Sequence, residues 1–267
     1  MLRKLLIRPG GIGDCILAIP AMEYLRSDFT EVWVPSPVVP LIQFAERVRA
    51  ISSTGLDVLG LPGVIPDAGL LKDLRSFDQI VSWYGSNRED FRDAVAALQL
   101  PFEFLEALPD ASGSMHCCDF FLKRVGGLIG GCPNIHFESV HRMKFAAIHP
   151  FSGSHKKNWP IHYYRELAAR LPLPVSWCAG PEEQLPDTVR MDDLYELGRW
   201  LSSARVYIGN DSGITHLAAA SGAPVVAIFG PSDPAVWAPR GGRVRIVSGT
   251  LENITVEEVL NAVSTLL

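Results

Sequence analysis

The chain has 267 residues, of which 48% are hydrophobic and 20% charged, a composition that is typical of a folded globular protein and excludes disorder. Its net charge of −5 provides no overall positive field for nucleic acid, and its apolar runs are too short or too interrupted for an integral membrane segment. The charged first eight residues are too short for a signal peptide, and five cysteines without a Cys-x-x-Cys pair imply neither disulfides nor zinc, so we expect a cytoplasmic protein.

Strand and helix patterns alternate along the first half of the chain. Short apolar runs predict strands at residues 5–7, 32–34 and 80–84, and helical patterns follow the first strand and recur at 91–98 and 116–125. A glycine-rich stretch at 126–133 is typical of the end of a unit or a hinge.

A second series of the same kind begins near Lys144. Its predicted strands cover residues 145–148, 175–178, 206–208, 225–229 and 244–247. Its predicted helices begin at Pro160, cover 194–201 and 214–220, and end the chain at 255–267, where Thr255 and Glu258 have the spacing of a capping box. Apolar strands between helices indicate parallel sheets covered on both faces. We therefore predict two Rossmann-like, doubly wound α/β domains facing a cleft, covering residues 1–140 and 141–267.

Four loops at predicted strand ends could carry chemistry. In the first, Gly10 to Gly13 lacks the spacing of a dinucleotide or P-loop motif, yet its glycines would let a ligand approach the backbone. Asp14 follows in the first helical turn, where it could cap the helix or act as a general base.

The second loop, residues 152–160, combines small residues with Lys157 and a helix start, which suits an anion. The alternative is a solvated loop whose lysines contact nothing.

The third loop joins Asp211, Ser212 and Gly213 to a helix that carries His216. Ser212 and Gly213 could bind phosphate at the helix start, whereas Asp211 could bind sugar hydroxyls or cap the helix. A single histidine on a helix is more often structural than catalytic.

The fourth loop, residues 230–234, has the composition of a plain turn. However, it follows a strand, as the second and third loops do, and ligands of parallel sheets bind at that edge.

The four motifs together resemble the ADP-heptose:lipopolysaccharide heptosyltransferase family. They are Arg8-x4-Gly13-Asp14, Lys157-x-Trp159-Pro160, Asp211-Ser212-Gly213-x-x-His216-x-Ala218 and Gly230-Pro231-Ser232-x-Pro234, and they occur in order over most of the chain. The resemblance implies the two-domain arrangement called GT-B and inverting transfer of heptose from ADP-heptose to a lipopolysaccharide-core or related, lipid-linked glycan. It implies no cofactor and no required metal, which fits a chain without an Asp-x-Asp motif. It also implies peripheral contact with the inner face of the cytoplasmic membrane.

The resemblance also implies roles for individual residues. Asp14 matches the proposed base, Lys157 and the Ser212-Gly213 turn match the diphosphate contacts, and Asp211 matches a contact to the transferred sugar. Either Glu182 or Glu183 would bind the ribose. Two other functions would need the same diphosphate loops: a sugar-nucleotide-binding protein without transferase activity, and a sugar-nucleotide epimerase.

Overall fold

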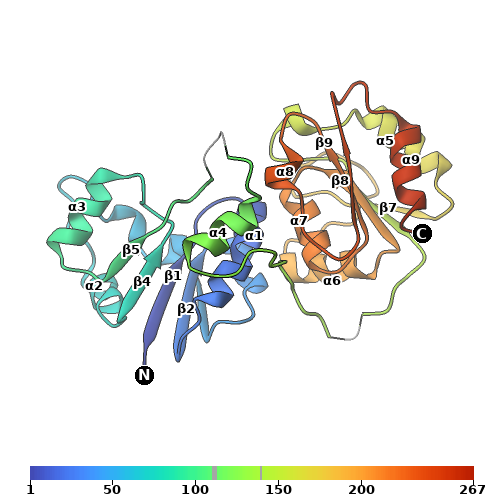
Figure 1. The fold of residues 1–267 in the computed structure, drawn as a ribbon. Helices are drawn as coiled ribbons and strands as arrows, with labels where there is room; N and C mark the ends of the chain where they lie inside the picture. The colour runs from blue at the N-terminus through green and yellow to red at the C-terminus, as the bar shows by residue number, and fades with distance from the viewer. Residues whose placement is uncertain (110–112, 139) are drawn as a thin grey trace. The chain divides into compact units, whose positions relative to one another are not determined.

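A computed structural model describes residues 1–109, 113–138 and 140–267. The chain divides into two compact units (Figure 1), with most of the first half in unit 1 and most of the second half in unit 2. Unit 1 holds Met1–Gly11, Ala18–Gly113 and Cys118–Gly131, and unit 2 holds Ile12–Leu17, Ser114–Cys117 and Cys132–Leu267. The predicted division after residue 140 falls before the first strand of unit 2 and stays a prediction.

Unit 1 is built on a five-stranded parallel sheet with the strand order β3-β2-β1-β4-β5. The strands are β1 (Arg3–Ile7), β2 (Phe29–Val34), β3 (Arg47–Ala50), β4 (Gln79–Ser82) and β5 (Phe102–Phe104). The helices are α1 (Ile12–Tyr24), α2 (Ala68–Leu74), α3 (Glu89–Ala97) and α4 (Cys117–Arg124), with short 3-10 helices at Ser36–Leu41, Ile51–Ser53 and Leu56–Val58. In Figure 1, α2 and α3 cover one face of this sheet and α1 and α4 the other, which is the doubly wound arrangement.

Three of the five strands of unit 1 match the predicted apolar runs, and two do not. Both strands that the sequence analysis missed, β3 and β5, lie at the edges of the sheet. β3 has the sequence Arg-Val-Arg-Ala and β5 has only three residues, and neither contains a fully buried residue. An edge strand has one open side and needs no continuous apolar run, so its pattern is weak.

Unit 2 contains a second five-stranded parallel sheet, in the order β10-β9-β8-β6-β7. Its strands are β6 (Ala146–His149), β7 (Val175–Trp177), β8 (Val206–Asn210), β9 (Val225–Phe229) and β10 (Val244–Ser248). Its helices are α5 (Ile161–Arg170), α6 (Leu194–Ser203), α7 (Gly213–Ala220), α8 (Pro234–Trp237) and α9 (Val256–Ser264), with a 3-10 turn at His155–Lys157. Helices α5 and α9 pack together on one face of the sheet, and α6 and α7 pack together on the other (Figure 1).

The core of unit 2 explains why the second half of the chain was the easier half to predict. Strands β8 and β9 are buried along their whole length, and Tyr164 and Leu167 of α5 pack on the same core as Val259 and Val263 of α9. The predicted capping box at the start of α9 is confirmed, since the Thr255 side chain accepts the Glu258 N–H and the Glu258 carboxylate accepts the Thr255 N–H.

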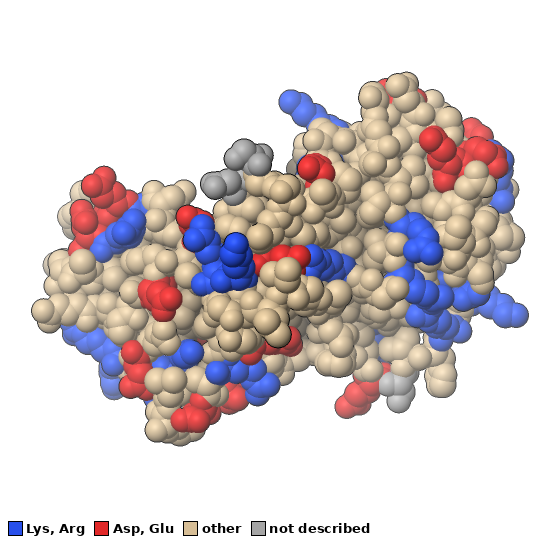
Figure 2. All heavy atoms as spheres, in the orientation of Figure 1, with Lys and Arg blue, Asp and Glu red and all other residues tan. Residues whose placement is uncertain are grey.

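The predicted fold class is therefore confirmed: two α/β units, each with a parallel sheet between helices. None of the helices within the described ranges is long and apolar enough to cross a membrane. Figure 2 shows acidic and basic side chains interspersed on the face in view.

Candidate functional site

The order of strands in unit 2 creates one preferred place for a ligand. Reading outward from β6, the chain first adds β7 on one side and then adds β8, β9 and β10 on the other. In open parallel sheets, ligands bind beyond the carboxyl ends of the strands at the point where this direction reverses. That point lies between β6 and β8, which are followed by the 150–160 loop and by the 211–213 turn. Two of the four predicted loops therefore meet there.

The side chain of Asn210, the last residue of β8, anchors the 150–160 loop to the sheet by hydrogen bonds. Its side chain is fully buried, and its Oδ1 accepts hydrogen bonds from the Trp159 backbone N–H at 2.9 Å and from the Tyr164 hydroxyl at 2.9 Å. Its Nδ2 donates to the Pro150 carbonyl oxygen at 2.8 Å. These three bonds hold both ends of the loop, so Lys157, which lies between them, is presented by a fixed backbone.

Lys157 forms an ion pair with Asp211. Its Nζ lies 2.6 Å from Asp211 Oδ2, and the lysine side chain is 36% exposed whereas the aspartate side chain is 7% exposed. A partly exposed cation over a buried carboxylate is a site that a second anion can enter from solvent. The alternative of a loop whose lysines contact nothing is wrong for Lys157.

The N-cap of helix α7 is Ser212 and not Asp211. The Ser212 hydroxyl accepts the Thr215 N–H, which makes Ser212 the N-cap, whereas the Asp211 carboxylate is turned to Lys157. The Thr215 hydroxyl donates to the carbonyl oxygen of Asn210 and lies 3.1 Å from the Ser212 hydroxyl. The start of α7 is thus fixed by buried hydroxyls, and its free N–H groups present a partial positive charge next to Lys157.

The first turn of α1 also belongs to unit 2 and meets the first turn of α7. A Cβ atom added to Gly13 would lie 2.8 Å from His216 Cδ2, and one added to Gly213 would lie 2.8 Å from Ile12 Cβ. Both distances are too short for a real Cβ, so these two helix starts approach as closely as they do because both positions are glycine. Asp14 is the third residue of α1, inside its first turn.

His216 is buried within this cluster and is neutral at pH 7. Burial lowers the pKa of His216 to about 4, although the carboxylates of Asp211 and Asp14 act in the opposite direction. Its Nδ1 has no hydrogen-bond partner among the described residues. A neutral imidazole adds no positive charge of its own, so Lys157 and the start of α7 are the positive groups of this cluster, and the Asp211 carboxylate is paired with Lys157.

Acid is expected to destabilise the folded chain partly through His216. The ordinary histidine pKa is 6.5 and the folded pKa is about 4, so between these values the unfolded chain binds one more proton. The stability is complete above pH 6.5 and is lost as the pH falls towards 4. We expect His216→Asn to reduce the loss of unfolding free energy between pH 7 and pH 4.5 by about 2 kcal/mol, measured by urea unfolding. An unchanged pH dependence would show that another group is responsible.

The two neighbouring glutamates of the 180–190 loop have different environments. Glu182 is exposed. Glu183 lies beyond β7, where its Oε2 contacts His149 Nε2 at 3.0 Å and the Gly180 N–H at 2.6 Å. Glu183 is therefore the glutamate that is held at the ligand-binding edge.

The 230–234 loop has the structure of an ordinary helix start. The Asp233 side chain caps α8 by accepting the Ala235 N–H, and a Cβ on Gly230 would meet the Leu251 side chain. These contacts account for the turn composition without a ligand.

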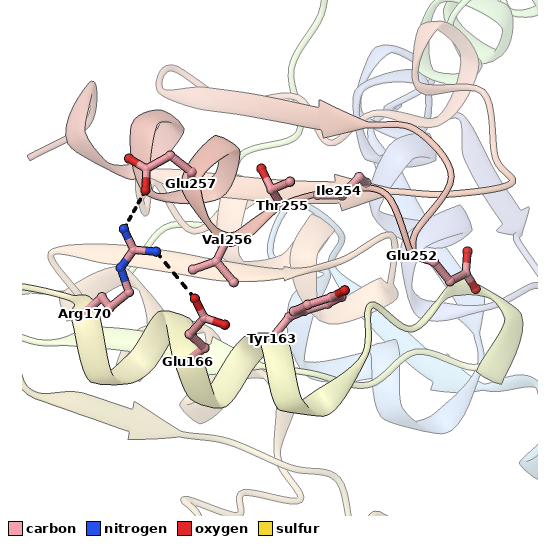
Figure 3. Close-up of a pocket in the computed structure, with 8 residues that line it drawn as sticks. All are labelled: Tyr163, Glu166, Arg170, Glu252, Ile254, Thr255, Val256 and Glu257. Carbon is pink, nitrogen blue, oxygen red and sulfur yellow. Dashed lines mark hydrogen bonds and ion pairs between the residues drawn. The ribbon is translucent and has the colours of Figure 1, made fainter.

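A hollow between α5 and the beginning of α9 (Figure 3) is less suited to an anion. Its lining residues are Tyr163, Glu166, Arg170, Glu252, Ile254, Thr255, Val256 and Glu257. Three of them are carboxylates, and the single guanidinium, that of Arg170, is already paired with Glu166 and Glu257. We therefore assign no phosphate-containing ligand to this hollow.

Three residues of the site were missed by the sequence analysis: Asn210, Thr215 and His149. His149 and Asn210 end strands β6 and β8, Thr215 lies in the first turn of α7, and each is buried. For His149 and Asn210 the available signal was a polar residue at the end of an apolar strand, because a buried polar side chain needs a partner.

Comparison with known proteins supports the resemblance found in the motifs. Residues 190–262 match the sequence model of glycosyltransferase family 9 (heptosyltransferase). Lipopolysaccharide heptosyltransferase 2 of Salmonella typhimurium is 27% identical over 217 residues, which cover 67% of this chain and 55% of that protein. The chain thus spans about half the length of the curated relatives that it matches.

The fold is shared over nearly the whole chain with two solved structures. The glycosyl transferase family 9 protein of Veillonella parvula superposes with a TM-score of 0.76 at 16% identity, covering 99% of this chain and 97% of that one. ADP-heptose lipopolysaccharide heptosyltransferase II of Escherichia coli superposes with a TM-score of 0.75 at 16% identity, covering 99% and 98%. The sequence matches to heptosyltransferases confirm the predicted resemblance to that family, and the two solved structures show that the fold is shared.

Proposed function

We propose that this chain is a glycosyltransferase that moves heptose from ADP-heptose to a lipopolysaccharide-core or related glycan, with inversion and without a required metal ion. The observation that carries the proposal is the Lys157–Asp211 ion pair beside the Ser212-capped start of α7, at the switch point of the second sheet. The names of the matched relatives supply the sugar and the nucleotide. The binding-protein and epimerase alternatives gain no support from these matches.

The diphosphate of the donor would bind between Lys157 and the start of α7. The lysine supplies a full positive charge and the free N–H groups of the helix supply a partial one, which suits an anion whose charge grows as it departs. The incoming diphosphate would take the place of the Asp211 carboxylate at Lys157 Nζ, now 2.6 Å away. Asp211 would then accept hydrogen bonds from hydroxyls of the transferred sugar.

Asp14 would act as the general base, and it is grouped with the donor residues in unit 2. Its carboxylate would take the proton of the acceptor hydroxyl while the acceptor oxygen attacks the anomeric carbon of the donor sugar. The bond from that carbon to the phosphate oxygen breaks, and ADP leaves with the electron pair. Gly13 and Gly213 let the start of α1 pack against the start of α7, which would keep Asp14 close to the donor residues.

The acceptor and the location of the enzyme follow from the same proposal. A lipid-linked glycan would be offered at the inner face of the cytoplasmic membrane, so we propose a cytoplasmic protein with peripheral contact there. No nucleic-acid partner is proposed, because the net charge is −5.

Titration calorimetry with ADP, UDP, GDP and NAD, each with and without magnesium, tests the donor. Binding of ADP in preference to the other nucleotides, unaffected by magnesium, supports the proposal and leads to a transfer assay with ADP-heptose. Preference for UDP or GDP would change the sugar donor, and binding of none of the four would contradict the proposed function.

Lys157→Ala is expected to weaken ADP binding by about 10- to 100-fold, because a charge-assisted contact to the diphosphate is lost. Lys156→Ala is the matched control, since Lys156 is exposed and has no ion pair with a described carboxylate. Equal ADP dissociation constants for the Lys157→Ala variant and the wild type would show that Lys157 does not bind the donor.

A further inference from the structure

We infer that His149 is a positioning residue that holds the Glu183 carboxylate for a hydroxyl of the donor's ribose. The inference rests on the proposed function, because it concerns the nucleotide of the same donor. His149 is the last residue of β6 and is 4% exposed, so its imidazole lies under the ligand-binding edge of the sheet. Nothing in the sequence motifs marked this residue.

The hydrogen bonds of Glu183 are concentrated on one of its two carboxylate oxygens. Oε2 accepts from the Gly180 N–H at 2.6 Å and contacts His149 Nε2 at 3.0 Å. A carboxylate only accepts hydrogen bonds, so His149 Nε2 is the donor. Oε1 has no hydrogen-bond partner among the described residues, and the side chain is 26% exposed. Oε1 is thus the atom left to accept a hydrogen bond from a ligand.

Glu183 remains ionised in this environment. Burial would raise its pKa, but the hydrogen bonds from His149 and from the Gly180 N–H outweigh burial and hold the pKa below the ordinary value. An ionised carboxylate accepts a stronger hydrogen bond from a hydroxyl than a neutral group does. The chemistry of the free oxygen therefore matches a sugar hydroxyl and would repel a phosphate.

The backbone around Glu183 is fixed without His149. The Glu183 N–H donates to the Gly180 carbonyl oxygen at 3.2 Å, which closes a turn. Arg190 then donates to the carbonyl oxygens of Gly180, Glu183 and Leu185. Loss of the imidazole would consequently leave the carboxylate with the Gly180 N–H as its remaining hydrogen-bond partner among the described residues, so that its orientation is less restricted while the loop stays in place. The proposed effect of His149 is therefore on the orientation of the Glu183 side chain and not on the backbone of the loop.

The position of Glu183 relative to Lys157 fits a nucleoside diphosphate. Lys157 and Ser212 follow β6 and β8, whereas Glu183 follows β7, on the other side of β6. Adjacent strands lie about 4.8 Å apart, so β8 and β7 are separated by about 10 Å. A diphosphate at the β6–β8 end and a ribose at the β7 end would span this edge.

The test compares binding of ADP with binding of 2′,3′-dideoxy-ADP, which keeps the diphosphate and lacks both ribose hydroxyls. In the wild type we expect ADP to bind about 10-fold more tightly than the dideoxy nucleotide. In His149→Asn we expect that preference to fall to about twofold, with the affinity for dideoxy-ADP unchanged, because the shorter amide cannot reach Glu183. His149→Gln places an amide N–H near the position of Nε2, and we expect it to restore most of the preference.

Two further variants complete the experiment. His162→Asn changes an exposed histidine on α5 and should keep the wild-type preference. Combining His149→Asn with Glu183→Gln should reduce the preference no further than Glu183→Gln alone, because both changes act on one contact.

The possible failures are distinguishable. An unchanged preference in His149→Asn, or an equal loss of affinity for both nucleotides, would overturn the role of His149. A wild type that binds both nucleotides equally well would overturn the ribose contact and leave the proposed function standing. A wild type that binds neither would contradict the proposed function and this inference with it.

Discussion

Asp14→Ala is expected to lower the turnover of heptose transfer by about two to four orders of magnitude, the usual contribution of a positioned general base. The affinity for ADP should stay within about threefold of the wild type, because Lys157 and the start of α7 hold the diphosphate. The measurement is kcat with ADP-heptose and acceptor, paired with calorimetric titration of ADP. A large loss of kcat at constant ADP affinity is the result specific to a base.

Asp14→Asn separates chemistry from structure. The amide has nearly the shape of the carboxylate but cannot take a proton at neutral pH, so we expect the same loss of turnover as in the alanine variant. Asp192→Ala, which changes an exposed aspartate of unit 2, should leave kcat unchanged. Wild-type turnover in Asp14→Asn would show that Asp14 is not the general base. A parallel loss of ADP affinity in both Asp14 variants would instead give it a role in shaping the donor site.

The fold was predictable from the sequence because burial on both faces of a parallel sheet leaves a strong pattern. The apolar strand Val225–Phe229 is buried over its whole length, and the helices between strands carry their own periodicity. The pattern is weak in the edge strands β3 and β5, whereas the edge strands β7 and β10 keep enough apolar residues to be predicted. The edge strand Arg47–Ala50 carries two arginines and no fully buried residue, so only the pairing with β2 identifies it.

The candidate site was predictable as a set of loops, but its pairings were not. Lys157 and Asp211 are separated by 54 positions, and sequence alone left each with a structural alternative that the ion pair between them removes. The choice between Glu182 and Glu183 likewise depended on His149, which lies 34 positions from its partner. Such contacts depend on the order of strands in the sheet, and a single sequence does not reveal that order.

Asn210 connects the stability of unit 2 to its proposed chemistry, and Asn210→Ala is expected to cost about 3–5 kcal/mol of unfolding free energy. The substitution leaves the Trp159 N–H, the Tyr164 hydroxyl and the Pro150 carbonyl oxygen buried without this partner. Each buried polar group that loses its partner costs about 1–3 kcal/mol, and the three losses share one small region and will not add fully. Urea unfolding of the variant and the wild type measures the difference.

The matched control is Asn253→Ala, which removes an exposed asparagine side chain from the same unit and should change stability by less than about 0.5 kcal/mol. A loss below about 1 kcal/mol in Asn210→Ala would show that water or a shifted loop satisfies the three groups. Under conditions where the variant is folded, the loop that carries Lys157 is no longer fastened to β8. We therefore expect ADP affinity to fall about tenfold as well. Binding of ADP to Lys157 would then also have to order the loop, and the entropy lost in that ordering weakens binding. A destabilised variant with wild-type ADP affinity would separate the two effects and make Asn210 a purely structural residue.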